Sequence, residues 1–197
     1  MNTTAPTRLP PALEPALQRV RLAARTAAER TVEALSLSAM SASNTAQRDA
    51  LLNGQFELNR KLAIFTLTFN ESLENQVAKQ VSPRTSTPSA PTTWDTMSLV
   101  EDHEVEIKVH AERFALNIHS HCEWEIRELA QYMGVVLRLG AADKERNPLR
   151  PEVIGQAMVR AVEATTERPE VQKVLLTEVG RSMAQSMRQT YIDIMND

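Results

Sequence analysis

One stretch of the sequence contains residue types that could do chemistry. Residues 117–129, NIHSHCEWEIREL, hold His119, His121 and Cys122 within four positions, and Glu123 follows directly. Imidazole and thiolate groups are ligands of zinc, and a cysteine next to a histidine suits nucleophilic catalysis. The stretch is therefore a candidate metal site, or a candidate catalytic site that uses Cys122 with His119 and Glu123.

Helical geometry argues against both candidates. Residues follow one another at about 100° around a helix, so His119 and His121 point in nearly opposite directions and cannot share a metal ion. His119 does neighbour Cys122 and Glu123 on a helix surface, but zinc would still need two ligands from elsewhere. Cys122 falls on the apolar side, where cysteine usually packs as a small hydrophobic residue, and the nearby carboxylates would raise its pKa. We expect no metal ligand, no cofactor-binding residue and no catalytic residue here.

The remaining histidines are too far apart to act together on one ion. His103, His110 and His121 share a helix face, but they stand roughly 10 and 16 Å apart along its axis. We expect solvated or half-buried histidines, with a pH-sensing cluster as the alternative.

Other residues that could bind ligands have simpler interpretations. Methionines at 133, 158, 183, 187 and 195 have helical spacing and are expected to fill the core, with an adaptable binding groove as the alternative. Trp94 is expected to dock a linker onto the helices. The sequence contains no Gly-rich phosphate loop, HExxH, GxSxG or Asp-rich metal loop.

The composition predicts an all-α protein. Hydrophobic residues make up 42% of 197 residues, which is enough for a real core, while only 4% are aromatic and five are glycine. A net charge of −3 favours neither nucleic acid nor an anionic membrane as a partner. The sequence shows no signal peptide and no membrane-spanning run, and its single cysteine fits a reducing cytoplasm.

Apolar periodicity predicts two helices before residue 82. The first begins near Pro11 and Pro15 and buries residues from Leu17 to Leu35. The second is expected to start with Asn44 as N-cap, with Gln47 three residues on, and its apolar stripe runs from 51 to 77. The two helices are expected to pair as an antiparallel hairpin.

Three helices are predicted after residue 96. Ser98 and Glu101 form a capping box that would start a straight helix, which would end near Gly140. Prolines then mark the first turns of a helix from Pro151 to about Thr165 and of another from Pro169 to about Met195.

These elements give an organisation in four parts. Residues 1–9 form a disordered tail, 10–81 a helical hairpin, 82–96 a flexible Pro/Ser-rich linker and 97–197 a three-helix region. The predicted architecture is a bundle of about five helices.

Several motifs resemble one bacterial family. SNTAQRDALLNGQFELNRKLAIFTLTF, a Pro/Ser-rich spacer, MSLVEDHEVE, NPLRPEVIGQAM and VQKVLLTEVG are similar, in that order, to the N-terminal part of the family called domain of unknown function 1631. The resemblance covers about residues 40–197 and departs from the family at Arg150, where glycine is usual. It implies that the chain continues in a longer protein. Some members carry a thymidine phosphorylase label, but the sequence has no anion site for phosphorolysis.

The expected function is therefore non-enzymatic. We expect a helical interaction or scaffolding module of a larger bacterial cytoplasmic protein. Its expected partner is another protein or a second copy of itself. Binding to nucleic acid, to a membrane or to a small-molecule ligand is not expected. The first alternative is a regulatory N-terminal region of a signalling protein whose ligand-binding or catalytic part lies beyond Asp197. The second is an enzyme that uses Cys122.

Overall fold

The protein is built from helices. The computed structural model describes residues 9–81, 94–137 and 147–196, and of residues 94–102 it describes the backbone alone. These residues contain no strand; their elements are the short 3-10 helix η1 (Pro11–Leu13) and the helices α1 (Glu14–Met40), α2 (Thr45–Arg60), α3 (Leu62–Val81), α4 (Trp94–Val136), α5 (Pro151–Thr165) and α6 (Pro169–Met195). The predicted all-α class is confirmed, with one α-helix more than expected.

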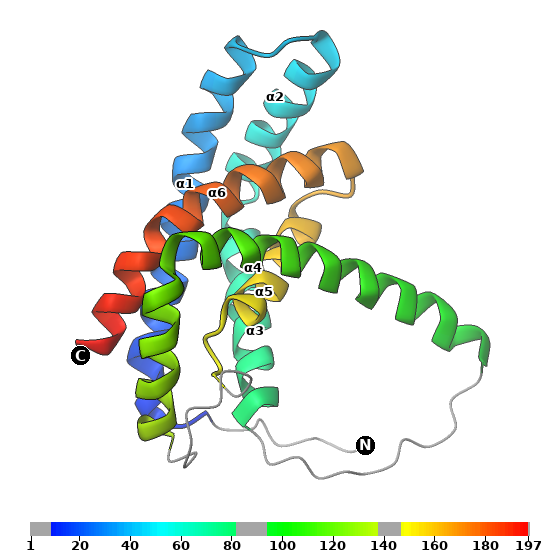
Figure 1. The fold of residues 1–197 in the computed structure, drawn as a ribbon. Helices are drawn as coiled ribbons and strands as arrows, with labels where there is room; N and C mark the ends of the chain where they lie inside the picture. Colours follow the sequence, from blue (N-terminus) through cyan, green and yellow to red (C-terminus); the bar gives the residue numbers. More distant parts are fainter. Residues whose placement is uncertain (1–8, 82–93, 138–146, 197) are drawn as a thin grey trace.

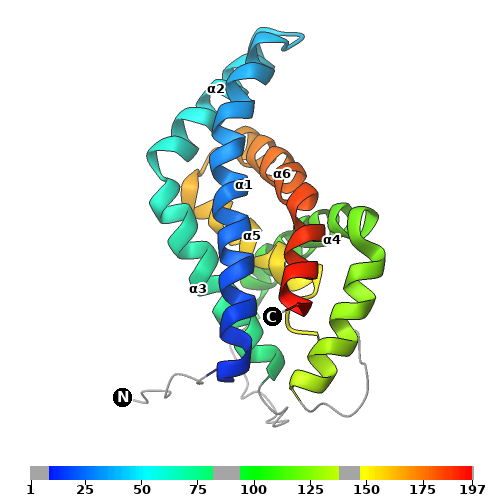
Figure 2. The same ribbon diagram turned by 90° about the vertical axis from the view of Figure 1, so that its left-hand side faces the viewer.

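α1 and α2 form the predicted antiparallel hairpin. Pro15 lies in the first turn of α1, where its missing N–H needs no partner. The Asn44 side chain accepts the N–H of Gln47 at 2.8 Å, which confirms Asn44 as the N-cap of α2. Figure 2 shows α1 running past both α2 and α3, so one helix supports the two that follow it.

A bend separates α2 from α3, so the prediction of one helix through Val77 was wrong. Lys61 has φ −110° and ψ 21°, yet it still donates to Glu57 and accepts from Phe65 through its backbone. Its ammonium group donates to the carbonyl of Thr165 at 2.7 Å. The bend lets α3 pack along α5 while α2 stays against α1 and α6.

α4 differs from the prediction at its start and in its middle. It begins at Trp94, so Ser98 lies inside the helix and is not its N-cap. Cys122 has φ −146° and ψ 41°, and Figure 1 shows the two halves of α4 meeting at a sharp corner there. The predicted helix is therefore not straight. Residues 1–8 of the predicted tail 1–9, most of the predicted linker and the end near Gly140 lie outside the described residues.

α5 is the central helix. Its predicted bounds and those of α6 are confirmed, and ten of its fifteen residues are buried. It packs against α3 and against α4, while α6 packs against α1 and α4 (Figure 1). Because this arrangement joins α1–α3 to α4–α6 in a large hydrophobic core, the surfaces left for function are the outer helix faces and the grooves between helices.

Candidate functional site

The stretch 117–129 forms the corner of α4. Three consecutive side chains bond to carbonyls of the preceding turn: Ser120 Oγ donates to Asn117 O at 2.8 Å, His121 Nδ1 lies 2.8 Å from the same oxygen, and Cys122 Sγ donates to Ile118 O at 2.8 Å. Side-chain bonds of this kind compete with the backbone ladder and bend helices. The residues that suggested chemistry are the residues that turn the helix.

The Cys122 thiol is poorly placed for a reaction. It is buried, with 1% of its surface exposed. Burial raises its pKa to about 12, and the carboxylate of Glu125 raises it further against the smaller opposing effect of Arg188. A nucleophilic cysteine needs the opposite, an accessible thiol in a positive environment. The geometry therefore does not support catalysis by Cys122 with His119 and Glu123.

Glu125 stabilises the helix restart after the corner. The carboxylate accepts from its own backbone N–H, which is the largest effect lowering its pKa, and also from Arg188 Nε of α6 at 2.7 Å. Its side chain is only 8% exposed. A carboxylate in the first turn of a helix is favoured by the helix dipole. Glu125 thus anchors the second half of α4 to α6.

The histidines make separate pairs across helices. His119 lies 3.2 Å from Glu152 and His103 lies 3.7 Å from Glu163, so both pair with α5. The Nδ1 atom of His121 instead contacts the carbonyl oxygen of Asn117 in the same helix. Among the described residues no three His, Cys, Asp or Glu side chains come together in a way that could hold a metal ion.

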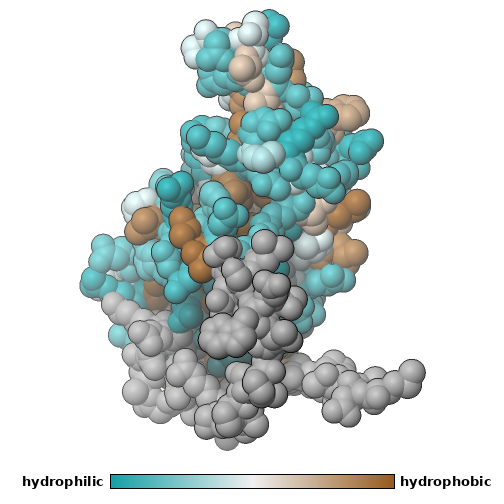
Figure 3. All heavy atoms as spheres, turned by 90° about the vertical axis from the view of Figure 1, so that its right-hand side faces the viewer, coloured by the Kyte–Doolittle hydropathy of each residue, from teal (hydrophilic) through white to brown (hydrophobic). Residues whose placement is uncertain are grey.

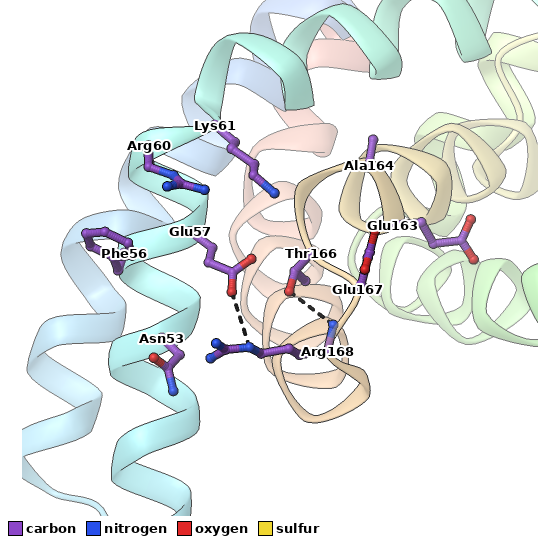
Figure 4. Close-up of a pocket in the computed structure, with 10 residues that line it drawn as sticks. All are labelled: Asn53, Phe56, Glu57, Arg60, Lys61, Glu163, Ala164, Thr166, Glu167 and Arg168. Carbon is purple, nitrogen blue, oxygen red and sulfur yellow. Dashed lines mark hydrogen bonds and ion pairs between the residues drawn. The ribbon is translucent and has the colours of Figure 1, made fainter.

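The structure also contains a groove that the sequence did not suggest. It has a volume of about 690 Å³ and lies where the end of α2 and the α2–α3 bend face the α5–α6 turn (Figure 4). Its lining comes from two segments: Asn53, Phe56, Glu57, Arg60 and Lys61 from the first, and Glu163, Ala164, Thr166, Glu167 and Arg168 from the second.

The charges in this groove largely satisfy one another. Lys61 bonds to a carbonyl at the end of α5, and Arg168 lies 3.7 Å from Glu57 across the groove (Figure 4). The Arg60 guanidinium lies 5.8 Å from the centre of the Phe56 ring, a cation–π contact. Three acidic and three basic residues line the groove. These contacts link the α2–α3 bend and the end of α2 to the α5–α6 turn.

Apolar side chains remain on several outer helix faces. The exposed large ones are Leu22, Leu37, Met40, Leu52, Phe56, Ile64, Leu67, Val105, Val109, Leu116, Trp124 and Val135. Figure 3 shows hydrophobic areas of this kind as separate patches among hydrophilic side chains on one face of the molecule. By contrast, the methionines at 133, 158, 183 and 187 are buried, as predicted for core residues, while Met195 borders a small groove between α4 and α6.

The fold defines a class of protein, a domain that is all-helical over its described residues. The family model described as "Protein of unknown function (DUF1631) N-terminal domain" matches residues 8–196, so the chain belongs to this family, the one that its motifs resemble. No curated protein and no solved structure matches it. None of the described helices is long and apolar enough to cross a bilayer.

Proposed function

We propose that this domain is a non-enzymatic helical interaction module, part of a larger bacterial protein, that works in the cytoplasm. Its task is to contact another protein chain through an outer helix face. The lone buried cysteine is compatible with a reducing compartment.

The observation that carries this proposal is the two-sided character of α4 before its corner. One face buries Ile107, Ala111, Phe114 and Ile118 in the domain. The opposite face exposes apolar side chains, among them Leu116 at 67%. Apolar residues aligned on an exposed helix face mark a binding surface more often than residues scattered singly.

Site-specific crosslinking in cells tests the proposal. A photoreactive benzoylphenylalanine replaces Leu116 in the intact native protein, and the matched control places it at Glu71, an exposed polar position on α3. We expect irradiation to yield a discrete covalent adduct with a protein chain at position 116 and none at position 71. If position 116, and likewise 105 and 109, gave no adduct, α4 would not be a binding face and the proposal would fail.

A second candidate is a regulatory domain. The matching family model is described as an N-terminal domain, and a helical domain without chemistry of its own would suit control of an activity located elsewhere in the protein. Under this hypothesis residues 1–197 alone bind no nucleotide and the intact protein does. Nucleotide binding by the isolated domain, measured by calorimetry, would contradict it.

A further inference from the structure

One line of residues runs along the exposed side of α4. Val105, Val109, Glu112 and Leu116 follow at spacings of four, three and four, the spacing that keeps side chains on a single seam of a paired helix. The three apolar members are 58%, 43% and 67% exposed, in chain order. We refer to these four residues as the α4 seam.

Charged side chains border the α4 seam on both sides. Glu106 and Arg113 lie along one edge, and Lys108 lies along the other edge, nearest Glu112. Glu106, Lys108, Glu112 and Arg113 are exposed, and within the described part of the chain none of them forms an ion pair. They are available for a partner with the opposite charge order.

We infer that the partner is a second copy of this chain, with its α4 antiparallel to the first across a two-fold axis. This inference rests on the proposed function and specifies the partner. A two-fold axis between residues 110 and 111 places Val105 against Leu116, and Val109 against Glu112, of the other copy. The same axis brings Glu106 near Arg113 and Lys108 near Glu112 of the other copy, each pair repeated by symmetry. The centres of the apolar and the charged pairs therefore fall within about one residue of each other along the helix.

The parallel arrangement lacks this complementarity. In a parallel pair, the flanking residue Lys108 would face Arg113 of the other copy, because flanking positions five residues apart meet across parallel helices. Two positive charges would then oppose each other on both sides of the axis. The charge order along the α4 seam thus selects the antiparallel dimer.

The surface predicts a weak dimer. Three apolar side chains from each copy form a small centre, below the area of a stable interface, so we expect dissociation constants on the order of tens of micromolar. The charged borders supply orientation more than affinity.

Charge exchange tests the inference. Sedimentation equilibrium of the intact protein from ~1 to ~500 µM should show the mass rise from one chain towards two. Glu106→Arg and Arg113→Glu should each weaken association at least tenfold, because each puts like charges opposite. Mixed in equal amounts, these two variants should form a heterodimer, and the double variant should dimerise like the native protein. Glu71→Arg on α3 is the control and should leave the dimer unchanged.

The outcomes separate this inference from the proposed function. A monomer at every concentration, or a dimer that neither single variant weakens, overturns the α4 pairing. If position 116 nevertheless crosslinks to a different protein, the interaction module stands and only self-pairing is wrong. Recovery in the mixed sample also shows that the single variants are folded, since unfolded chains would not regain association.

Discussion

Gly155 lies where the backbones of α4 and α5 come very close, which makes it a sharp test of the packing. A Cβ atom at this position would lie 2.7 Å from the carbonyl oxygen of Ala111 and 3.1 Å from its Cα. Both are backbone atoms of α4 and cannot rotate away. Gly155→Ala should therefore force the two helices apart.

The size of the effect follows from two opposing contributions. Overpacking a well-packed core costs about 1–3 kcal/mol. Replacing a mid-helix glycine by alanine raises the free energy of unfolding by about 0.5–1 kcal/mol, because alanine has less conformational freedom than glycine in the unfolded chain. Gly155→Ala should thus lower the free energy of unfolding by about 1–2 kcal/mol, or the urea midpoint by roughly 0.5–1 M for a slope near 2 kcal/mol per molar.

Gly54→Ala provides the matched control. A Cβ there would meet side-chain carbons of Leu175 and Val174 at 3.5 Å, an ordinary contact. The same exchange should therefore stabilise the protein by about 0.5–1 kcal/mol. Urea unfolding followed by circular dichroism at low protein concentration compares the two variants. If Gly155→Ala raised stability as Gly54→Ala does, the close contact of α4 with α5 would be refuted.

Three further predictions concern the corner and the hairpin. Cys122, with its pKa raised to about 12, should resist a thiol reagent at pH 8 in the folded protein and react at once in urea; fast native labelling would contradict its burial. Folding lowers the pKa of Glu125, so this carboxylate stabilises the protein above its unfolded-state pKa, and the stabilisation is lost as the pH falls through its folded-state pKa. Glu125→Gln should therefore lose less stability in acid than the native protein does. An unchanged dependence of the free energy of unfolding on pH would exclude this contribution. Asn44→Ala, which removes the bond to the Gln47 N–H, should destabilise the protein by about 1 kcal/mol, measured by urea unfolding, whereas Asn44→Ser should be nearly neutral.

The helix positions could be predicted because their signals are local. The proline at the start of α5 and the proline at the start of α6 fix where each begins, and the apolar stripe runs to the end that the structure shows. Asn44 likewise predicts the start of α2, because an N-cap side chain accepts a backbone N–H from the first turn of its own helix. Such signals do not depend on tertiary contacts.

The bend and the corner could not be predicted from periodicity. The apolar stripe continues at helical spacing through Lys61 and through Cys122, because each half of a broken helix still presents the same side to the core. At the corner, side chains bond to carbonyls of the previous turn, an interaction that can bend a helix. Serine and cysteine make such bonds in straight helices as well, so their presence alone does not reveal a corner.

The groove between the α2–α3 bend and the α5–α6 turn could not be predicted from the sequence for a different reason. Lys61 and Thr165 meet although more than a hundred residues separate them, and neither segment carries a recognisable motif. The α4 seam, in contrast, was present in the sequence as Val105, Val109 and Leu116. Only the structure shows which of the two apolar sides of this helix faces outward.

The corner in α4 helps to determine which surface is left for a partner. Beyond Cys122 the helix turns and packs on α6 through Glu125 and Arg188, so its second half is tied to the domain. The first half is held from one side, where Gly155 of α5 lets the backbones meet. A helix held in this way on one side leaves its opposite face exposed to a partner. The side chains that resembled a catalytic motif therefore bear on function indirectly, by turning the helix whose outer face we propose as the binding surface.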